Sequence, residues 1–271
     1  MRAVWSFWSR PFSGRTWQQP CHEWAAFALS CLAASRHYSD TLLVTDSDGA
    51  RLFAALGVPY REISTVLDEL GPVGPLHPNR DKLRAHRVAC QLGDPYFHID
   101  GDAFLWAPLP PHAERAPVFC ESVFSAGGIA PPVRELFERH HGFVPPSWGR
   151  GDSSLAGGIL GGTDLETLHQ WVTEAETWED DPRNAAAWTL VHATERWALG
   201  MSEEPLVGSV CAARGVTPLG LFPRFGWRQP GVYEHFMAAG AKAAHGPRIL
   251  NALRDVDPVV FERVMAHREA A

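Results

Sequence analysis

The chain has 271 residues, of which 45% are apolar, including 11 Trp and 14 Phe, so it can bury a sizeable core. Its 24 Lys and Arg residues against 31 Asp and Glu residues give a formal net charge of −7, which argues against a general grip on nucleic acid. No stretch approaches the roughly 18 apolar residues of a membrane span, and the N-terminus lacks a secretory leader pattern. Five scattered cysteines indicate reduced thiols. We therefore expect a soluble, cytoplasmic globular protein.

The first half of the chain alternates strand-like and helix-like segments. Apolar and β-prone runs predict strands at residues 2–8, 41–46, 59–64 and 95–100. Helix-like runs lie between them, at residues 22–38, 49–57 and 80–93. This alternation predicts an α/β fold with a mixed, mainly parallel central sheet and helices on both faces. Ligands of such folds bind beyond the carboxyl ends of the strands, where Asp46 and Asp100 both fall.

The second half of the chain is less regular. Prolines recur from residue 107 to residue 148 and divide this stretch into short pieces, so we interpret it as an insertion or lid beside the site. It contains one predicted helix, residues 133–141, which we expect to end at Gly142. The glycine-crowded sequence SSLAGGILGG, residues 153–162, predicts one strand.

Further helices are predicted towards the C-terminus. Thr163 and Glu166 have the spacing of a capping box, so a helix is expected to begin there. Another covers residues 184–200, and the chain from Val232 onwards is again helix-prone. Because no internal repeat and no flexible linker separates two units, we expect a single domain over residues 1–271.

The sequence FHIDGDAFLW, residues 97–106, fits two incompatible structures. Asp100-Gly101-Asp102 is a strong signal for a hairpin turn, in which Gly101 would take a positive φ. The preceding PYFHI, however, is apolar throughout, as a central parallel strand is, and such a strand is not followed directly by a hairpin partner. In an extended chain Asp100 and Asp102 point to the same side, and their hard oxygens suit Mg²⁺ or Mn²⁺. We favour this metal site, with Gly101 allowing a ligand to approach the backbone closely.

The residues around this motif resemble a known family. HIDGDAFLW, preceded by RDKLRAH, resembles the metal-binding Asp-x-Asp region of GT-A-fold glycosyltransferases. VWSFWSRPF and AGGILGG are similar to segments of uncharacterised bacterial proteins related to glycosyltransferase family 8, and the resemblance covers most of residues 1–162. It implies a GT-A-like, Rossmann-like fold with a nucleotide-binding half at residues 1–106 and an acceptor-side half at residues 107–271. It also implies a nucleotide-sugar donor, with a UDP-sugar favoured.

The resemblance implies further ligands for the metal and the donor. It calls for a late histidine as third metal ligand, followed by a glycine and a lysine that contact the diphosphate. EHFMAAGAKAAHG supplies His235, Gly240 and Lys242, with a spacing stretched relative to the common His-x-x-Gly-x-x-Lys pattern. It also singles out Lys82, on the helix before the Asp-x-Asp strand, for the donor phosphate or sugar. A surface position or a helix-capping role is the alternative for His235.

The ends of the first two predicted strands supply candidate contacts to the nucleotide. Trp5, Ser6 and Phe7 lie where GT-A enzymes usually seat the nucleotide base, although an aromatic-rich first strand also fits a plain core role. Thr45 and Asp46 end the second predicted strand, where a carboxylate can accept hydrogen bonds from the base or ribose.

Three carboxylates are candidates for a catalytic base or for stabilising positive charge on the sugar. Glu121 follows the apolar run PVFC, and Glu195 lies in the predicted helix before Gly200. Asp152 is a candidate because family 8-like enzymes usually have an Asn before the small-residue strand, where this chain has Leu155-Ala156-Gly157. A simple turn role for Asp152 is at least as compatible with the glycines before it.

These patterns together predict a metal-dependent, hexosyltransferase-like glycosyltransferase. Mn²⁺ or Mg²⁺, held by Asp100, Asp102 and His235, would neutralise the departing diphosphate with help from Lys242 and Lys82. The acceptor stays open between a small molecule, a glycan and a peptide, and the resemblance to family 8 favours retention of configuration.

Two other functions also fit the Asp-x-Asp motif. A haloacid-dehalogenase-like phosphatase would use Asp100 as nucleophile and Asp102 as acid, although its motif belongs on the first strand. A non-catalytic nucleotide-sugar or glycan-binding protein would use the same ligands without transferring the sugar.

Overall fold

A seven-stranded sheet forms the centre of the computed structural model, which describes residues 1–9, 17–70, 79–128, 130–194, 200–224, 226–236 and 239–270. The strand order is β10-β6-β9-β4-β1-β2-β3. The strands are β1 (Arg2–Phe7), β2 (Thr41–Thr45), β3 (Glu62–Ser64), β4 (Tyr96–Ile99), β6 (Phe119–Cys120), β9 (Ile159–Gly162) and β10 (Leu219–Gly220). β1 to β4 run parallel, and β9 is antiparallel to its neighbours β4 and β6. The predicted mixed, mainly parallel sheet is confirmed.

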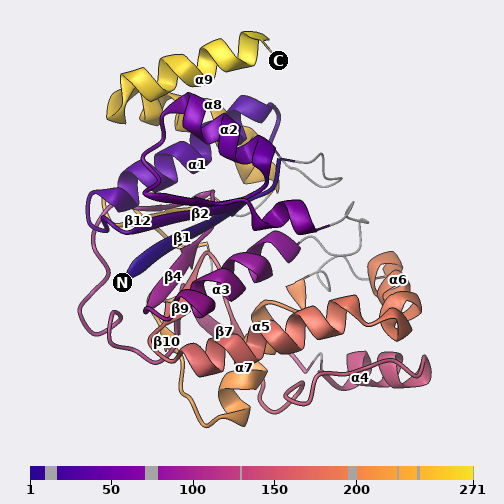
Figure 1. Ribbon diagram of the computed structural model, residues 1–271. Coiled ribbons are helices and arrows are strands. Elements are labelled where there is room, and N and C mark those ends of the chain that lie inside the picture. The colour runs from indigo at the N-terminus through magenta and orange to yellow at the C-terminus, as the bar shows by residue number, and fades with distance from the viewer. Residues whose placement is uncertain are drawn as a thin grey trace.

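Helices cover both faces of this sheet, as predicted (Figure 1). One face carries α1 (Pro20–Ser35), α2 (Ser47–Leu56), α8 (Ala239–Val256) and α9 (Pro258–Ala270). The other carries α3 (Arg80–Leu92), α5 (Leu165–Asp180), α6 (Ala185–Thr194) and α7 (Glu204–Ala213), with α4 (Ala130–Arg139) beside them. Single 3₁₀ turns follow β3 (Val66–Glu69) and α5 (Pro182–Asn184). Within the described ranges, no helix combines the length and the apolar character that crossing a membrane requires.

Side chains of the central strands alternate between two hydrophobic cores. Trp5 and Phe7 of β1 are buried on the α1 side, whereas Val4, which precedes Trp5, is buried on the α3 side. The same alternation separates Phe97 and Ile99 of β4 from Tyr96. Because both faces are covered, the strands are apolar throughout, and this explains why the sequence PYFHI does not alternate.

Two small sheets flank the central one. β5 (Ala103–Leu105), β12 (Tyr233–His235) and β11 (Arg228–Gln229) form an antiparallel sheet in which β12 lies in the middle. β7 (Val123–Ser125) and β8 (Ser153–Leu155) form an antiparallel pair. The first of these sheets brings the C-terminal part of the chain against the segment that follows β4.

Several predicted boundaries are wrong, and each has a local cause. The expected single strand over SSLAGGILGG divides into β8 and β9, which belong to different sheets. The helix after β9 is capped by Asp164, whose carboxylate accepts a hydrogen bond from the Thr167 amide, whereas Thr163 bonds to the Ala116 carbonyl. His141, not Gly142, takes the left-handed conformation after α4.

The two ends of the second half also differ from expectation. The chain after Val232 first forms β12 and only then α8, so His235 lies on a strand and not at a helix start. The helix predicted at residues 184–200 is observed as α6, and its remainder, including Glu195, lies outside the described residues.

Candidate functional site

The segment after β4 turns sharply but does not form a hairpin. The Ala103 amide donates to the Asp100 carbonyl at 3.0 Å, and β5 then pairs with β12 and not with β4. Gly101 is absent from the residues with a positive φ. A Cβ atom at this position would instead come within 2.5 Å of three carbons of the Phe27 ring. The rejection of a hairpin is therefore confirmed, and the close approach that Gly101 permits is that of Phe27.

The pairing of β5 with β12 brings His235 to the two aspartates. Ala103 is the register partner of His235, and the Phe236 amide donates to the Asp102 carbonyl at 3.0 Å. His235 Nε2 consequently lies 3.6 Å from Asp102 Oδ1 and 4.0 Å from Asp100 Oδ2. One ligand atom from each of the three residues lies within 4.8 Å of the others. The three predicted metal ligands are thus brought together.

Glu121 fixes the orientation of the His235 ring. Its side chain is fully buried, and Oε2 lies 2.8 Å from His235 Nδ1, while Oε1 accepts a hydrogen bond from the Trp227 amide at 3.1 Å. A carboxylate that accepts from Nδ1 turns Nε2 towards the aspartates, which is a common arrangement behind metal-binding histidines. Burial would lower the pKa of His235, but hydrogen bonds and charge from Asp102 and Glu121 raise it to about 10. A cation at Nε2 would therefore displace a proton.

Gly157 and Gly158 allow these charged groups to approach the sheet. A Cβ atom at Gly158 would lie 2.5 Å from Glu121 Oε2 and closer still to His235 Nδ1. A Cβ atom at Gly157 would lie 2.7 Å from Lys82 Nζ and closer still to Glu203. These two glycines lie between β8 and β9. Side chains at their positions would overlap with the Lys82–Glu203 pair and with the His235–Glu121 pair.

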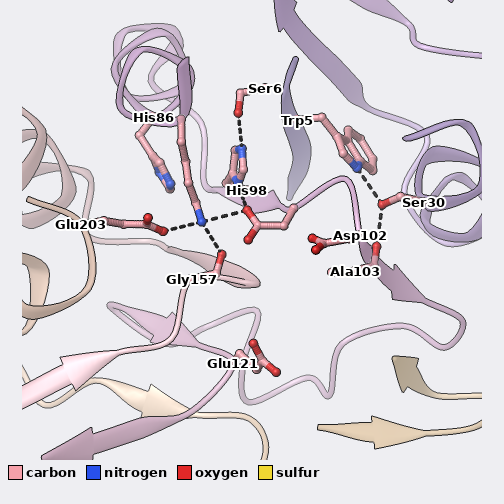
Figure 2. A network of polar contacts seen from close by, with 12 residues as sticks. Trp5, Ser6, Ser30, His86, His98, Asp102, Ala103, Glu121, Gly157 and Glu203 are labelled. Atoms are coloured by element: carbon pink, nitrogen blue, oxygen red, sulfur yellow. Dashed lines mark hydrogen bonds and ion pairs between the residues drawn. The ribbon is translucent and has the colours of Figure 1, made fainter. Parts of the chain in front are cut away.

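Lys82 lies on the other side of Asp100. Its ammonium group donates to the Gly157 carbonyl at 2.8 Å, lies 2.8 Å from Asp100 Oδ1 and forms an ion pair with Glu203 (Figure 2). Burial would lower the pKa of Lys82, but the carboxylates of Asp100 and Glu203 raise it. Lys82 is therefore charged and holds Asp100 in place.

Lys242 contacts the second aspartate. Its Nζ lies 2.7 Å from Asp102 Oδ2 and 5.8 Å from the centre of the Trp17 ring. Burial would raise the pKa of Asp102, but Lys242 and His235 lower it. Asp102 is therefore ionised at neutral pH.

A pocket of about 230 Å³ opens over these groups. Besides Asp100, Gly101, Asp102 and the two lysines, it is lined by Ser6, Trp17, Glu23, Phe27, Asn79, Asp81, His98 and Glu203. Its lining contains five carboxyl groups and two ammonium groups. Burial lowers the pKa of His98 well below its usual range, so His98, which hydrogen-bonds Ser6 at 3.2 Å (Figure 2), adds no charge.

The residues predicted to contact the nucleotide fall in different environments. Ser6 lines the pocket, whereas Trp5 is buried and its indole N–H donates to Ser30 Oγ at 2.9 Å (Figure 2). Phe7 packs edge-on against Phe27 and Phe53. These two rings belong to the core on the α1 side.

Thr45 and Asp46 at the end of β2 are both buried. The Asp46 carboxylate caps α2 by accepting from the Gly49 amide at 2.8 Å, and it also accepts from Ser9 Oγ at 2.6 Å. Neither residue is among those that line the pocket.

The candidate catalytic carboxylates are also separated. Asp152 is exposed and accepts hydrogen bonds from Ser125 Oγ at 2.5 Å and from the Gly128 amide at 3.2 Å. Like Glu121, which lies behind His235, it is not among the residues that line the pocket.

Three pocket carboxyl groups, those of Glu23, Asp81 and Glu203, were not identified from the sequence. Asp81 precedes Lys82 in the first turn of α3, and burial raises its pKa although a hydrogen bond with Ser6 opposes this. Glu203 precedes α7, and burial raises its pKa although Lys82 opposes this. Asp81 was detectable as the neighbour of Lys82, whereas no local pattern connects Glu203 with Lys82.

The donor set fits a divalent cation. Two carboxylates and an imidazole whose far nitrogen is held by Glu121 supply the hard oxygen and nitrogen ligands that Mn²⁺ accepts, and Mn²⁺ accommodates imidazole better than Mg²⁺ does. Asp100 and Asp102 would supply oxygen and His235 would supply Nε2.

The structure is similar to solved glycosyltransferases. It matches the galactosyltransferase LgtC in complex with donor and acceptor sugar analogs with a TM-score of 0.40 and 12% sequence identity, over 95% of this chain and 96% of that chain. It matches an active-site mutant of LgtC with a TM-score of 0.36 and 12% identity, over 93% and 96% of the two chains. No curated protein sequence matches the chain. The sequence pattern of DUF6734, a family of unknown function, matches residues 1–195, and the chain belongs to this family.

Proposed function

We propose that the protein is a metal-dependent glycosyltransferase that uses a nucleotide-diphosphate sugar as donor. The observation that carries this proposal is the cluster of Asp100, Asp102 and His235 at a pocket, in which Asp102 and His235 are buried, Asp100 is partly exposed, and Lys82 and Lys242 contact the two aspartates. The cluster follows the carboxyl end of β4, which is the side of a parallel sheet where ligands bind. A UDP-sugar is the favoured donor, in keeping with the family resemblance.

The charge of the pocket supports a requirement for metal. Its lining carries more carboxyl groups than ammonium groups, so a free diphosphate would be repelled. Asp100, Asp102 and His235 would hold a divalent cation, which would offset this repulsion and supply positive charge to stabilise the leaving group. A bound cation would thus favour an anionic substrate in this pocket.

The residues of the chain have separate tasks in this scheme. Glu121 is fully buried and holds the His235 ring, so we assign it to positioning and not to contact with the sugar. Lys82 is engaged by three acceptors and keeps Asp100 in place. Lys242 is the cation available to the diphosphate. Besides the two aspartates, Glu23, Asp81 and Glu203 line the pocket, and we assign these carboxyl groups to contacts with the hydroxyls of the sugar.

The environment of Asp102 disfavours the phosphatase alternative. In that mechanism the second aspartate must donate a proton to the leaving group. Lys242 and His235 instead lower the pKa of Asp102, so this carboxyl group carries no proton to donate at neutral pH. Metal binding, in contrast, requires the ionised form.

The proposal is tested by donor hydrolysis and by calorimetry. Wild-type protein with Mn²⁺ should bind UDP or GDP and release it slowly from a nucleotide sugar, and Asp102→Ala should lose both properties. Asp94→Ala is the matched control, because Asp94 is exposed and precedes the opposite end of β4. Failure of the wild-type protein to bind any nucleoside diphosphate in the presence of Mn²⁺ would refute the proposal. Binding without hydrolysis or transfer would indicate a non-catalytic binding protein, and release of phosphate from phosphomonoesters would indicate the phosphatase.

A further inference from the structure

Both lysines of the chain lie in this pocket. The sequence contains 24 Lys and Arg residues, and all of them except Lys82 and Lys242 are arginines. Each lysine contacts one aspartate of the Asp-x-Asp motif, with Nζ 2.8 Å from Asp100 Oδ1 for Lys82 and 2.7 Å from Asp102 Oδ2 for Lys242. A lysine ammonium is a compact point charge on a flexible stem, and it can replace or be replaced by a metal ion more readily than the planar fork of an arginine.

The two lysines are held very differently. Lys82 has three acceptors from three parts of the chain, namely Asp100, Gly157 and Glu203, and its side chain is 9% exposed. Its positive charge is balanced by Glu203 even without Asp100. Lys82 therefore belongs to the fixed structure of the site.

Lys242 has one carboxylate partner among the described residues, Asp102, and its side chain is 23% exposed. Its other close neighbour is the face of Trp17, at a distance of 5.8 Å from the ring centre. The contact with Asp102 uses a carboxylate that a metal ion would also use. Because two cations on one carboxylate repel each other, this contact and a bound metal ion oppose each other.

We propose that Lys242 is an internal competitor for the metal ion. It occupies Asp102 in the ligand-free protein and leaves this carboxylate when a divalent cation binds. This inference rests on the proposed function and adds an order of binding to it. The cation binds first and releases the Lys242 ammonium, which then contacts an anionic ligand such as a diphosphate. Metal and diphosphate consequently strengthen each other's binding, since the coupling between two ligands is reciprocal.

Calorimetry with Mn²⁺ alone tests the competition. Lys242→Met should bind Mn²⁺ about tenfold more tightly than wild-type protein, which is within the usual range of coupling between two ligands. Lys242→Arg keeps a positive charge beside Asp102 and should gain no affinity. In the presence of Mn²⁺, Lys242→Met should bind UDP more weakly than wild-type protein, because the released ammonium is missing.

A second measurement observes the two lysine side chains directly. Protein labelled with ¹³C at lysine Cε should give two side-chain signals, since the chain has two lysines. Saturation with Mg²⁺, which is not paramagnetic, should shift the Lys242 signal much more than the Lys82 signal, because Lys82 keeps its contacts with Glu203 and the Gly157 carbonyl. The variant Lys242→Met, in which one signal disappears, assigns the spectrum.

The outcomes separate this inference from the proposed function. If wild-type protein and Lys242→Met bind Mn²⁺ with equal affinity, or if Mg²⁺ binds without moving the Lys242 signal, the competition is refuted and the metal site stands. If neither protein binds Mn²⁺ or Mg²⁺, the metal site itself is refuted, and the competition with it.

Discussion

The charged groups on the two sides of the site are paired in different ways. The Lys82 side, consisting of Lys82, Asp100, Gly157 and Glu203, pairs buried charges with one another and with a backbone carbonyl. The metal side consists of Asp102, Lys242 and His235 with Glu121 behind it. Together with Asp100, which both sides share, Asp102 and His235 surround a space beside the Lys242 ammonium. The contacts of the Lys82 side fix the position of Asp100, whereas the metal side allows one cation to replace another at Asp102. A binding site of this kind needs both, because a mobile cation is useful only if its carboxylates stay in place.

The largest effect is expected from removing the charge on the Lys82 side. Lys82→Met leaves the buried Glu203 without its cation and Asp100 without its anchor, and such a loss typically costs about 3–5 kcal/mol. Urea denaturation should show this loss in the free energy of unfolding. Lys242→Met, on the more exposed side, should change the same quantity by less than about 1 kcal/mol.

A double variant checks the cause of this loss. Lys82→Met combined with Glu203→Gln removes the unpaired carboxylate, so it should recover part of the stability lost in Lys82→Met alone. Equal losses in the single and double variants would show that packing of the lysine stem, and not the unpaired charge, determines the effect.

Substitutions of the adjacent glycines Gly157 and Gly158 should have effects of intermediate size, and each should affect a different side of the site. Gly158→Ala places a methyl group against His235 Nδ1 and Glu121 Oε2, so it should disturb the orientation of the imidazole and weaken Mn²⁺ binding by about 10–100-fold. Gly157→Ala places its methyl group against Lys82 and Glu203, so it should mainly lower the free energy of unfolding, by about 1–3 kcal/mol.

Calorimetry measures the Mn²⁺ affinity of both glycine variants, and urea denaturation measures their free energy of unfolding. Glu121→Gln serves as a second perturbation of the metal side, because it weakens the partner of His235 Nδ1 without adding volume. If Gly157→Ala weakens Mn²⁺ binding as much as Gly158→Ala does, the two sides are not separable.

The sequence was sufficient for the parts of the site that depend on local pattern. Asp100 and Asp102 could be placed together because two residues in an extended chain share a side and because an apolar strand precedes them. The carboxyl-end position followed from the alternation of strands and helices. His235 and Lys242 were reached through the family resemblance, since their contact with the aspartates depends on pairing between two three-residue strands, β5 and β12.

Other features could not be predicted because they depend on contacts between distant segments. Glu203 meets Lys82 only because the segment before α7 packs beside α3, and nothing in the local sequence of either residue records this. The aromatic ring that excludes a side chain at Gly101 comes from α1. Asp46 is an instance of competing local roles, because a carboxylate at a strand end is also a good helix cap, and here it caps α2.

The smallest effect concerns the support behind the Lys82 side. Glu179 Oε1 accepts a hydrogen bond from Ser202 Oγ at 2.5 Å, and Ser202 precedes Glu203. Burial raises the pKa of Glu179 from 4.5 to about 7, with Ser202 and Arg80 opposing this shift. Because the pKa is higher in the folded protein than in the unfolded chain, the contribution of Glu179 to stability is largest below pH 4.5 and is lost as the pH rises through 7.

Glu179→Gln removes this titration while keeping an acceptor for Ser202. The variant should be about 1 kcal/mol more stable than wild-type protein at pH 8, because glutamine avoids the cost of ionising this buried carboxyl group, a cost that exceeds the stabilisation by Arg80 and Ser202. Below pH 4.5, where Glu179 is protonated and uncharged, the two proteins should have the same free energy of unfolding. Urea denaturation across this pH range measures the difference, and a gap that stays constant with pH would show that Glu179 does not titrate there. A gap that opens between pH 4.5 and 7 without any change in Mn²⁺ affinity would show that the Lys82 side can be strengthened independently of the metal side.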